Sequence, residues 1–154
     1  MERDSYLDGI HSAWLGEQFG EVFFSALADR AGDDTMRDKW QRLAQLENLT
    51  GKRMAGILES YGQAPTAGDI EVGDDILSRY TDVSHHDAML GMRDVVEKAI
   101  IHFDQLLAVA PEQDVPHVQF LVQHEQALLT FVERELAGDG GNALEAVDAL
   151  LADG

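Results

Sequence analysis

Apolar side chains recur every three or four residues along most of the chain, the spacing that places them on one face of an α-helix. The pattern predicts four long helices, over 5–30, 36–61, 85–110 and 116–136, and one short helix over 142–152. In the second of these, the apolar positions alternate in steps of four and three, as in a heptad seam. No segment shows the alternating apolar pattern of a β-strand, so we expect an all-α protein.

The segments between the predicted helices indicate how the helices are arranged. Within each pair of long helices the connection is short, and a short connection between long helices produces an antiparallel hairpin. The connection 62–83 is much longer and contains Pro65 and three glycines. A structureless loop of that length is uncommon inside a compact domain. We therefore expect it to cross over along the bundle, with a turn or two of helix at 75–80.

The last predicted helix follows a cluster of glycines. Asn142 and Glu145 have the spacing of a capping box at its start. Its apolar residues need cover, so we expect it to pack across one end of the bundle or against a partner.

Length and composition are typical of one folded domain. The chain has 154 residues and is 45% hydrophobic, which is enough for a single core, and we assign residues 1–154 to one domain with its core over 5–137. Acidic residues outnumber basic ones by 29 to 11, giving a net charge of −18. Such a chain repels phosphate backbones and anionic membrane surfaces, so we expect neither a nucleic acid nor a membrane as its partner.

Cysteine is absent from the sequence, which excludes disulfides, thiolate metal ligands and cysteine nucleophiles. Residues 1–5 lack the basic and apolar regions of a signal peptide. No apolar run approaches the length needed to span a membrane. We therefore expect a cytoplasmic protein.

Each of the four long predicted helices carries one glutamate in an otherwise apolar stretch: Glu17, Glu47, Glu97 and Glu125. The two hairpins would bring these carboxylates to a common level. Burial of a lone carboxylate costs several kcal/mol, so four of them inside a bundle would suit a pair of divalent metal ions. The alternative is a metal-free core with protonated or paired carboxylates. An ion pair between Arg93 and Glu97, one helical turn apart, is sufficient to explain Glu97.

At this point the chain resembles the ferritin-like superfamily. Segment 17–24 (EQFGEVFF) resembles the family's first helix, with a ligand glutamate, a small residue three positions later and a pair of large residues. Segment 95–100 (VVEKAI) is similar to the third helix, and the connection 62–83 matches the family's crossover. The resemblance covers about 6–136. It implies an up-down four-helix bundle with a long crossover between its second and third helices, and a homodimer as the usual assembly.

The resemblance also implies a dinuclear iron or manganese site at the four glutamates. Such a site would handle iron, oxygen or peroxide, as in relatives of ferritin and rubrerythrin. The alternative is a metal-free bundle of the same fold that works as a structural or protein-interaction module.

The chain departs from the family where the second ligand of each Glu-x-x-His pair should lie, because Thr50 and Leu128 occupy the two histidine positions. The remaining ligands are all oxygen atoms, which favour harder cations such as Mn²⁺, Mg²⁺ or Ca²⁺. His124 precedes Glu125 and so points about 100° away round the helix. We therefore expect His124 on a neighbouring face and not as a replacement ligand.

Overall fold

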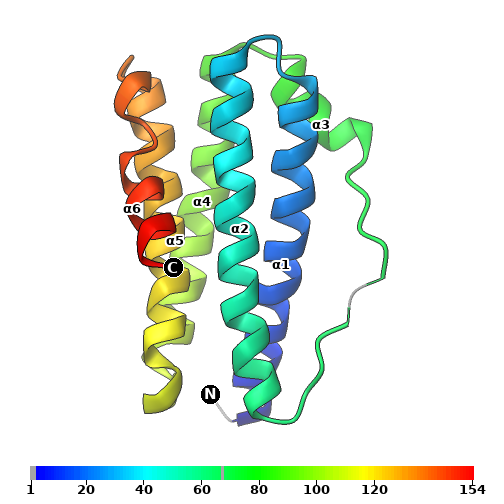
Figure 1. Ribbon diagram of the computed structural model, residues 1–154, viewed down its shortest axis with the longest axis vertical. Coiled ribbons are helices and arrows are strands. Elements are labelled where there is room, and N and C mark those ends of the chain that lie inside the picture. Colours follow the sequence, from blue (N-terminus) through cyan, green and yellow to red (C-terminus); the bar gives the residue numbers. More distant parts are fainter. Residues whose placement is uncertain (1–2, 67) are drawn as a thin grey trace.

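The computed structural model describes residues 3–66 and 68–154, and the regular secondary structure in these ranges is entirely helical (Figure 1). This confirms the expected all-α class. The helices are α1 (Arg3–Arg30), α2 (Asp34–Ser60), α3 (Asp74–Thr81), α4 (His85–Ala108), α5 (Val115–Leu136) and α6 (Glu145–Asp153), with 3-10 turns η1 (Glu112–Asp114) and η2 (Gly140–Asn142) before and after α5. The four long helices begin and end within two residues of the predicted positions.

The long helices form two hairpins, α1 with α2 and α4 with α5. The short connection between α1 and α2 ends at Asp33, which caps α2. The Oδ1 atom of Asp33 accepts a hydrogen bond from the Met36 backbone N–H at 2.7 Å. Ser84 caps α4 in the same way, through the Asp87 backbone N–H at 3.0 Å. Contacts between α2 and α5 join the two hairpins.

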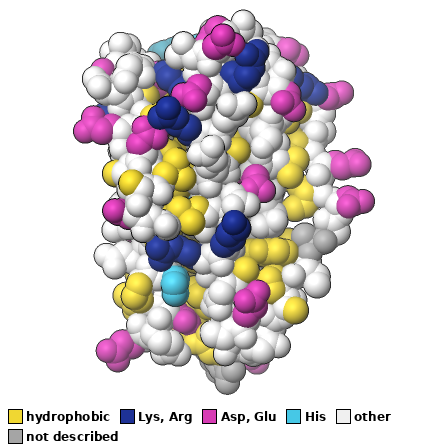
Figure 2. All heavy atoms as spheres, in the orientation of Figure 1, with side chains coloured by type: hydrophobic (Ala, Val, Ile, Leu, Met, Phe, Trp, Pro, Cys, Tyr) yellow, Lys and Arg dark blue, Asp and Glu magenta, His cyan; other side chains and the backbone are white. Residues whose placement is uncertain are grey.

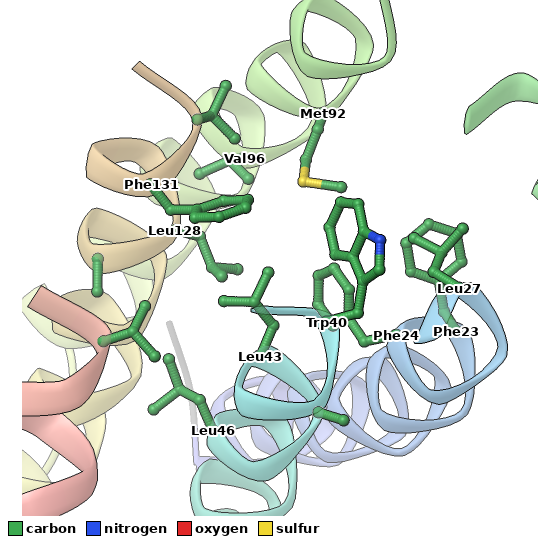
Figure 3. Packing of buried hydrophobic residues seen from close by; sticks show 14 of the residues in the cluster. Phe23, Phe24, Leu27, Trp40, Leu43, Leu46, Met92, Val96, Leu128 and Phe131 are labelled. Atoms are coloured by element: carbon green, nitrogen blue, oxygen red, sulfur yellow. The ribbon is translucent and has the colours of Figure 1, made fainter. Parts of the chain in front are cut away.

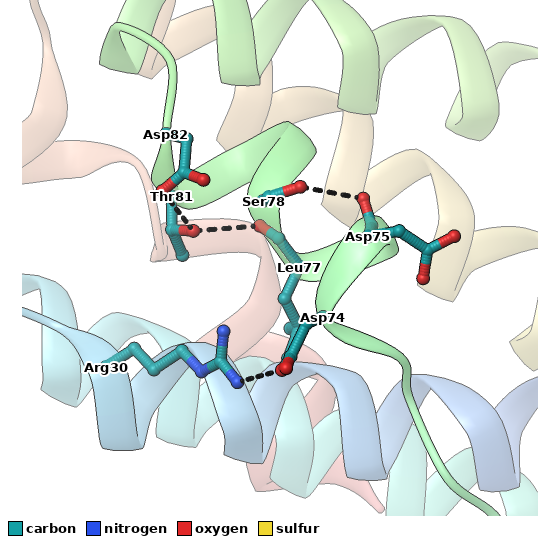
Figure 4. Close-up of polar contacts among 7 residues, drawn as sticks. All are labelled: Arg30, Asp74, Asp75, Leu77, Ser78, Thr81 and Asp82. Carbon is teal, nitrogen blue, oxygen red and sulfur yellow. Dashed lines mark hydrogen bonds and ion pairs between the residues drawn. The ribbon is translucent and has the colours of Figure 1, made fainter.

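The connection from α2 to α4 runs along the outside of α1 to the opposite end of the molecule (Figure 1). Its second half is α3, which contacts both α1 and α4. Leu77 anchors α3 in the core, and an ion pair of 2.7 Å between Arg30 Nη2 and Asp74 Oδ1 fixes its start (Figure 4). The short helix thus lies over the side of the molecule where α1 and α4 face each other.

The buried apolar residues form two clusters, stacked along the helix axes. The larger cluster is built around Trp40 and Phe131, with Met92 and Val96 of α4 opposite the aromatic residues of α1 (Figure 3). The smaller cluster includes Ile10 of α1 and residues near the far ends of α2, α4 and α5. On α1, α2 and α5 the polar residues that are buried at mid-helix lie between these clusters, so the core contains a polar layer.

Helix α6 lies along the sides of α5 and α2, where it buries Val147 completely, and not across an end of the bundle as predicted (Figure 1). The predicted capping box is also wrong. Asn142 belongs to η2 and its Nδ2 donates to Asp139 Oδ1 at 2.9 Å, while Glu145 accepts from Arg134 Nη1 at 3.2 Å. The glycines after α5 turn the chain back so sharply that Asn142 bonds to the turn instead of to α6.

The surface reflects the acidic composition. Acidic side chains are spread over the face in Figure 2, with basic side chains among them, and do not gather in one patch. Within the described ranges, no helix has both the length and the apolar character needed to cross a membrane.

Candidate metal centre

The polar layer consists of five side chains from three helices: Glu17 of α1, Glu47 and Thr50 of α2, and His124 and Glu125 of α5. All five residues are buried, with exposed fractions of 8% or less. Buried charge is costly unless it is paired or bound to a metal ion. The two apolar clusters lie on either side of the layer along the helix axes.

His124 is at the centre of this layer. Its Nδ1 is hydrogen-bonded to Thr50 Oγ1 at 2.7 Å. The same nitrogen lies 3.5 Å from Glu17 Oε2, and Nε2 lies 3.4 Å from Glu47 Oε2. The imidazole therefore contacts side chains from both helices of the first hairpin.

Glu17, His124 and Glu125 could hold a metal ion. One ligand atom from each residue lies within 4.8 Å of the other two. Ligand atoms that bind a common ion at about 2.0–2.2 Å lie up to about 4 Å apart, so small side-chain movements would close the site. The carboxylate of Glu47, on the other side of His124, is available as a further ligand.

Two atoms of the layer, Glu17 Oε2 and His124 Nε2, are buried without a hydrogen-bond partner among the described residues. Such atoms are rare in folded proteins and are often explained by an ion or a water molecule. Histidine ligands usually donate their second ring N–H to a nearby acceptor, which orients the ring. If His124 donates from Nδ1 to Thr50, its Nε2 presents a lone pair to the layer.

The electrostatics of the layer favour protons or a cation. Burial raises the pKa of Glu17 well above its usual range, and the nearby carboxylates of Glu47 and Glu125 raise it further. Burial raises the pKa of Glu125 to about 7, although the neighbouring His124 acts in the opposite direction. Burial alone would lower the pKa of His124, but the carboxylates of Glu47 and Glu125 outweigh it and raise that pKa. A cation that enters the layer therefore displaces protons.

Gly20 makes room for the α2 carboxylate against the backbone of α1. A Cβ at this position would lie 2.6 Å from Glu47 Oε1 and Cδ, which is closer than non-bonded atoms approach. Gly16, one turn earlier, would place a Cβ in open space. The small residue three positions after Glu17 thus has a specific role in placing Glu47.

The structure does not bring Glu97 to the other three glutamates. Its side chain is 55% exposed and lies 3.8 Å from Arg93 Nε, in the ion pair that the sequence offered as the alternative. Val96 is the residue that α4 buries at this level, and a side chain one position further along a helix points about 100° away. Three of the four expected carboxylates therefore meet, and α4 contributes no carboxylate to the layer.

The sequence interpretation placed His124 on a neighbouring face of its helix and not among the ligands. In the structure His124 is fully buried and lies at the centre of the polar layer. Helix α5 is covered by α2, α4 and α6, so it buries more than one face. A second stripe on α5, made of Phe120, His124, Ala127 and Phe131, is buried throughout. Its spacing of four, three and four residues was the signal in the sequence that could have identified His124 as a core residue.

A cavity of about 420 Å³ lies beside the layer, between α1 and α4. The carboxylates of Glu17, Glu47 and Glu125 form part of its wall, and the remainder is mostly apolar.

Comparisons of the chain with protein-family models, with curated proteins and with solved structures find no match. The function is therefore inferred from the geometry of the polar layer and of this cavity.

Proposed function

We propose that this chain is a ferritin-like protein that binds a divalent transition-metal ion in its polar layer. Glu17, His124 and Glu125 would be ligands, and Glu47 would complete the set. The observation that carries the proposal is the pair of buried atoms that lack a hydrogen bond, Glu17 Oε2 and His124 Nε2, whose charged neighbours lie at 3.5 and 3.4 Å, in a group of side chains compact enough to hold an ion. Two helical hairpins joined by a long crossover support the ferritin-like assignment.

The ligand set, which includes an imidazole, suits one ion of Fe²⁺ or Mn²⁺ better than Mg²⁺ or Ca²⁺, two of the harder cations that the all-oxygen set predicted from the sequence favoured. Imidazole nitrogen with carboxylate oxygen is a common environment for these metals. The sequence predicted a pair of ions, but Glu97 lies outside the group. We therefore propose a single ion, held by up to three carboxylates and one imidazole.

The proposed activity is chemistry on oxygen or peroxide. A bound Fe²⁺ or Mn²⁺ would supply one-electron redox chemistry, and a reductant from outside the chain would return the ion to its divalent state and complete the electron balance. The protein would contribute a layer set between two apolar clusters, and carboxylates that neutralise the ion. In the metal-free layer the pKa of Glu125 is about 7, so binding of the ion near neutral pH would release protons.

A second candidate function is a metal-free interaction module. Protons can neutralise the layer, because burial favours the uncharged forms of Glu17 and Glu125. Val95 of α4 and Phe19 of α1, which are 58% and 36% exposed, line the same apolar cavity at the surface, and grouped apolar side chains on a surface suit contact with a partner. In this case a homodimer through α4 is the proposed assembly.

Metal analysis separates the two candidates. The protein is loaded anaerobically with Fe²⁺ or Mn²⁺, desalted and analysed by mass spectrometry, together with Glu17→Gln, His124→Asn and the matched control Glu97→Gln. We expect about one ion per chain in the wild type and in the control, and a loss in the two layer variants, because these lack a ligand.

A wild type that retains no metal contradicts the metal centre. Equal retention by all four proteins places the metal elsewhere and contradicts the ligand assignment. Light scattering on the same samples tests the homodimer.

A further inference from the structure

The cavity between α1 and α4 exists because these two helices barely touch. Helix α1 packs on α2 and α3, and α4 packs on α5 and α3. The space left between them is about 420 Å³, which lies within the range of about 300–1,000 Å³ for small-molecule sites.

The wall of the cavity is mainly apolar. Aromatic and aliphatic side chains from both helices form it: Phe19, Phe23 and Phe24 of α1, and Met92, Val96 and Phe103 of α4. Figure 3 shows Phe23 and Phe24 on one side, and Met92 and Val96 on the other. Such a wall offers dispersion contacts and few hydrogen bonds, so it favours an apolar occupant.

The cavity has a buried end and an exposed end. Glu17, Glu47 and Glu125 lie at the buried end, with exposed fractions of 3%, 6% and 8%. Arg79 of α3 and Val95 of α4 lie at the exposed end. Any molecule that enters between α1 and α4 is therefore led towards the proposed metal ligands.

We propose that this cavity binds an uncharged, mainly apolar organic molecule and holds it against the carboxylate layer. The role of this molecule as a substrate rests on the metal centre proposed above, whereas its binding does not. The apolar wall argues for an uncharged molecule. Protons or the proposed metal ion neutralise the carboxylates at the buried end, so these offer no free charge to pair with the head group of a charged ligand. The apolar wall would desolvate that head group. Arg79 is exposed, so water screens its attraction for an anion.

The binding test uses N-phenyl-1-naphthylamine, an uncharged probe whose fluorescence rises in apolar surroundings. Two variants fill the cavity from opposite walls. Ala99→Phe adds a ring from α4, and Gly16→Leu adds a side chain from α1 where a Cβ meets nothing within 4 Å. Ala108→Phe makes the same substitution at an exposed position of α4 and is the control. Circular dichroism and metal content are measured on every protein.

We expect a saturable rise in fluorescence with the wild type and the control, and its loss in both filling variants. We also expect 1-decanol to displace the probe at lower concentration than decanoate or decylamine, which have the same chain length. No saturable binding by the wild type overturns the proposal, as does binding that survives in both folded filling variants. Stronger displacement by either charged competitor overturns the assignment to an uncharged molecule.

The metal measurement distinguishes failure of this proposal from failure of the metal centre. Metal without probe binding overturns the cavity inference alone. Probe binding without metal supports the binding site and overturns the metal centre. A stable dimer that binds no probe assigns the cavity to a second copy of the chain and overturns the proposal.

Discussion

The substitution Gly20→Ala tests whether the position of Glu47 matters for metal binding, without removing any ligand. The added Cβ would lie 2.6 Å from Glu47 Oε1 and Cδ, and 2.9 Å from Oε2. Non-bonded atoms prefer separations of about 3.5 Å. The Glu47 carboxylate must therefore move by about 1 Å, away from its place 3.4 Å from His124 Nε2.

The expected effects on stability and on metal binding have opposite signs. Replacing a mid-helix glycine with alanine stabilises a helix by about 0.5–1 kcal/mol, and the flexible end of a glutamate side chain can move at little cost. The unfolding free energy of metal-free Gly20→Ala should therefore be equal to that of the wild type or slightly higher. Disturbing a group that supports a metal site typically lowers metal affinity by about 10- to 100-fold, and we expect a loss in this range.

Gly16→Ala is the matched control, because the same substitution one turn earlier on α1 places its Cβ in open space. It should gain about 0.5–1 kcal/mol of stability with no change in metal affinity. Urea unfolding measures the first quantity, and competition with a chromophoric chelator measures the second. Equal metal affinities for the two alanine variants would refute the role assigned to Gly20 and Glu47.

Three further predictions follow from individual contacts. Thr50→Val removes the 2.7 Å hydrogen bond to His124 Nδ1, and it should cost about 1–3 kcal/mol in urea unfolding and lower metal affinity about 10- to 100-fold; unchanged values would contradict this. Tyr6→Phe removes the hydroxyl that donates to Asp114 Oδ2 at 2.9 Å, and it should cost about 1.5–3 kcal/mol with metal content unchanged, since this contact lies outside the polar layer. In metal-free protein, Glu125 has a pKa raised from 4.5 to about 7, so the folded state binds this proton more tightly than the unfolded state. Its contribution to stability should be complete below about pH 4.5 and be lost as the pH rises through about 7. Urea unfolding across this range should give a flatter dependence for Glu125→Gln than for the wild type, and an equal slope would exclude Glu125 as the cause.

The helix positions were predicted well from the sequence, because the features that determine them lie within each helix or next to its ends. Apolar periodicity and the capping residues Asp33 and Ser84 act within one or two turns, so helix positions follow from neighbours in the chain. The start of α6 was predicted less well. There the apparent capping box of Asn142 and Glu145 was overridden by competing side-chain contacts with Asp139 in the same turn and with Arg134 at the end of α5.

The candidate site was predicted in part because burial of α4 and α5 depends on their neighbours. Glu17, Glu47 and Glu125 lie on the main apolar stripes, and those stripes are buried. Glu97 is one position beyond Val96 and is exposed, since α4 buries only one face at this level. His124 is one position before Glu125 and is buried, because α6 and α2 cover a second face of α5. Adjacent residues thus differ in burial on both helices. The one sequence signal for His124 is the second apolar stripe of α5, through Phe120, Ala127 and Phe131.

The central claim is tested most directly by a crystal structure of the protein loaded with Mn²⁺, using anomalous scattering to locate the ion. We predict one anomalous peak in the polar layer, bonded to a ring nitrogen of His124 and to carboxylate oxygens of Glu17 and Glu125, with Thr50 still bonded to the other ring nitrogen. An ordered layer with no peak, in which Glu17 is hydrogen-bonded to Glu47 or to water, would contradict the metal centre.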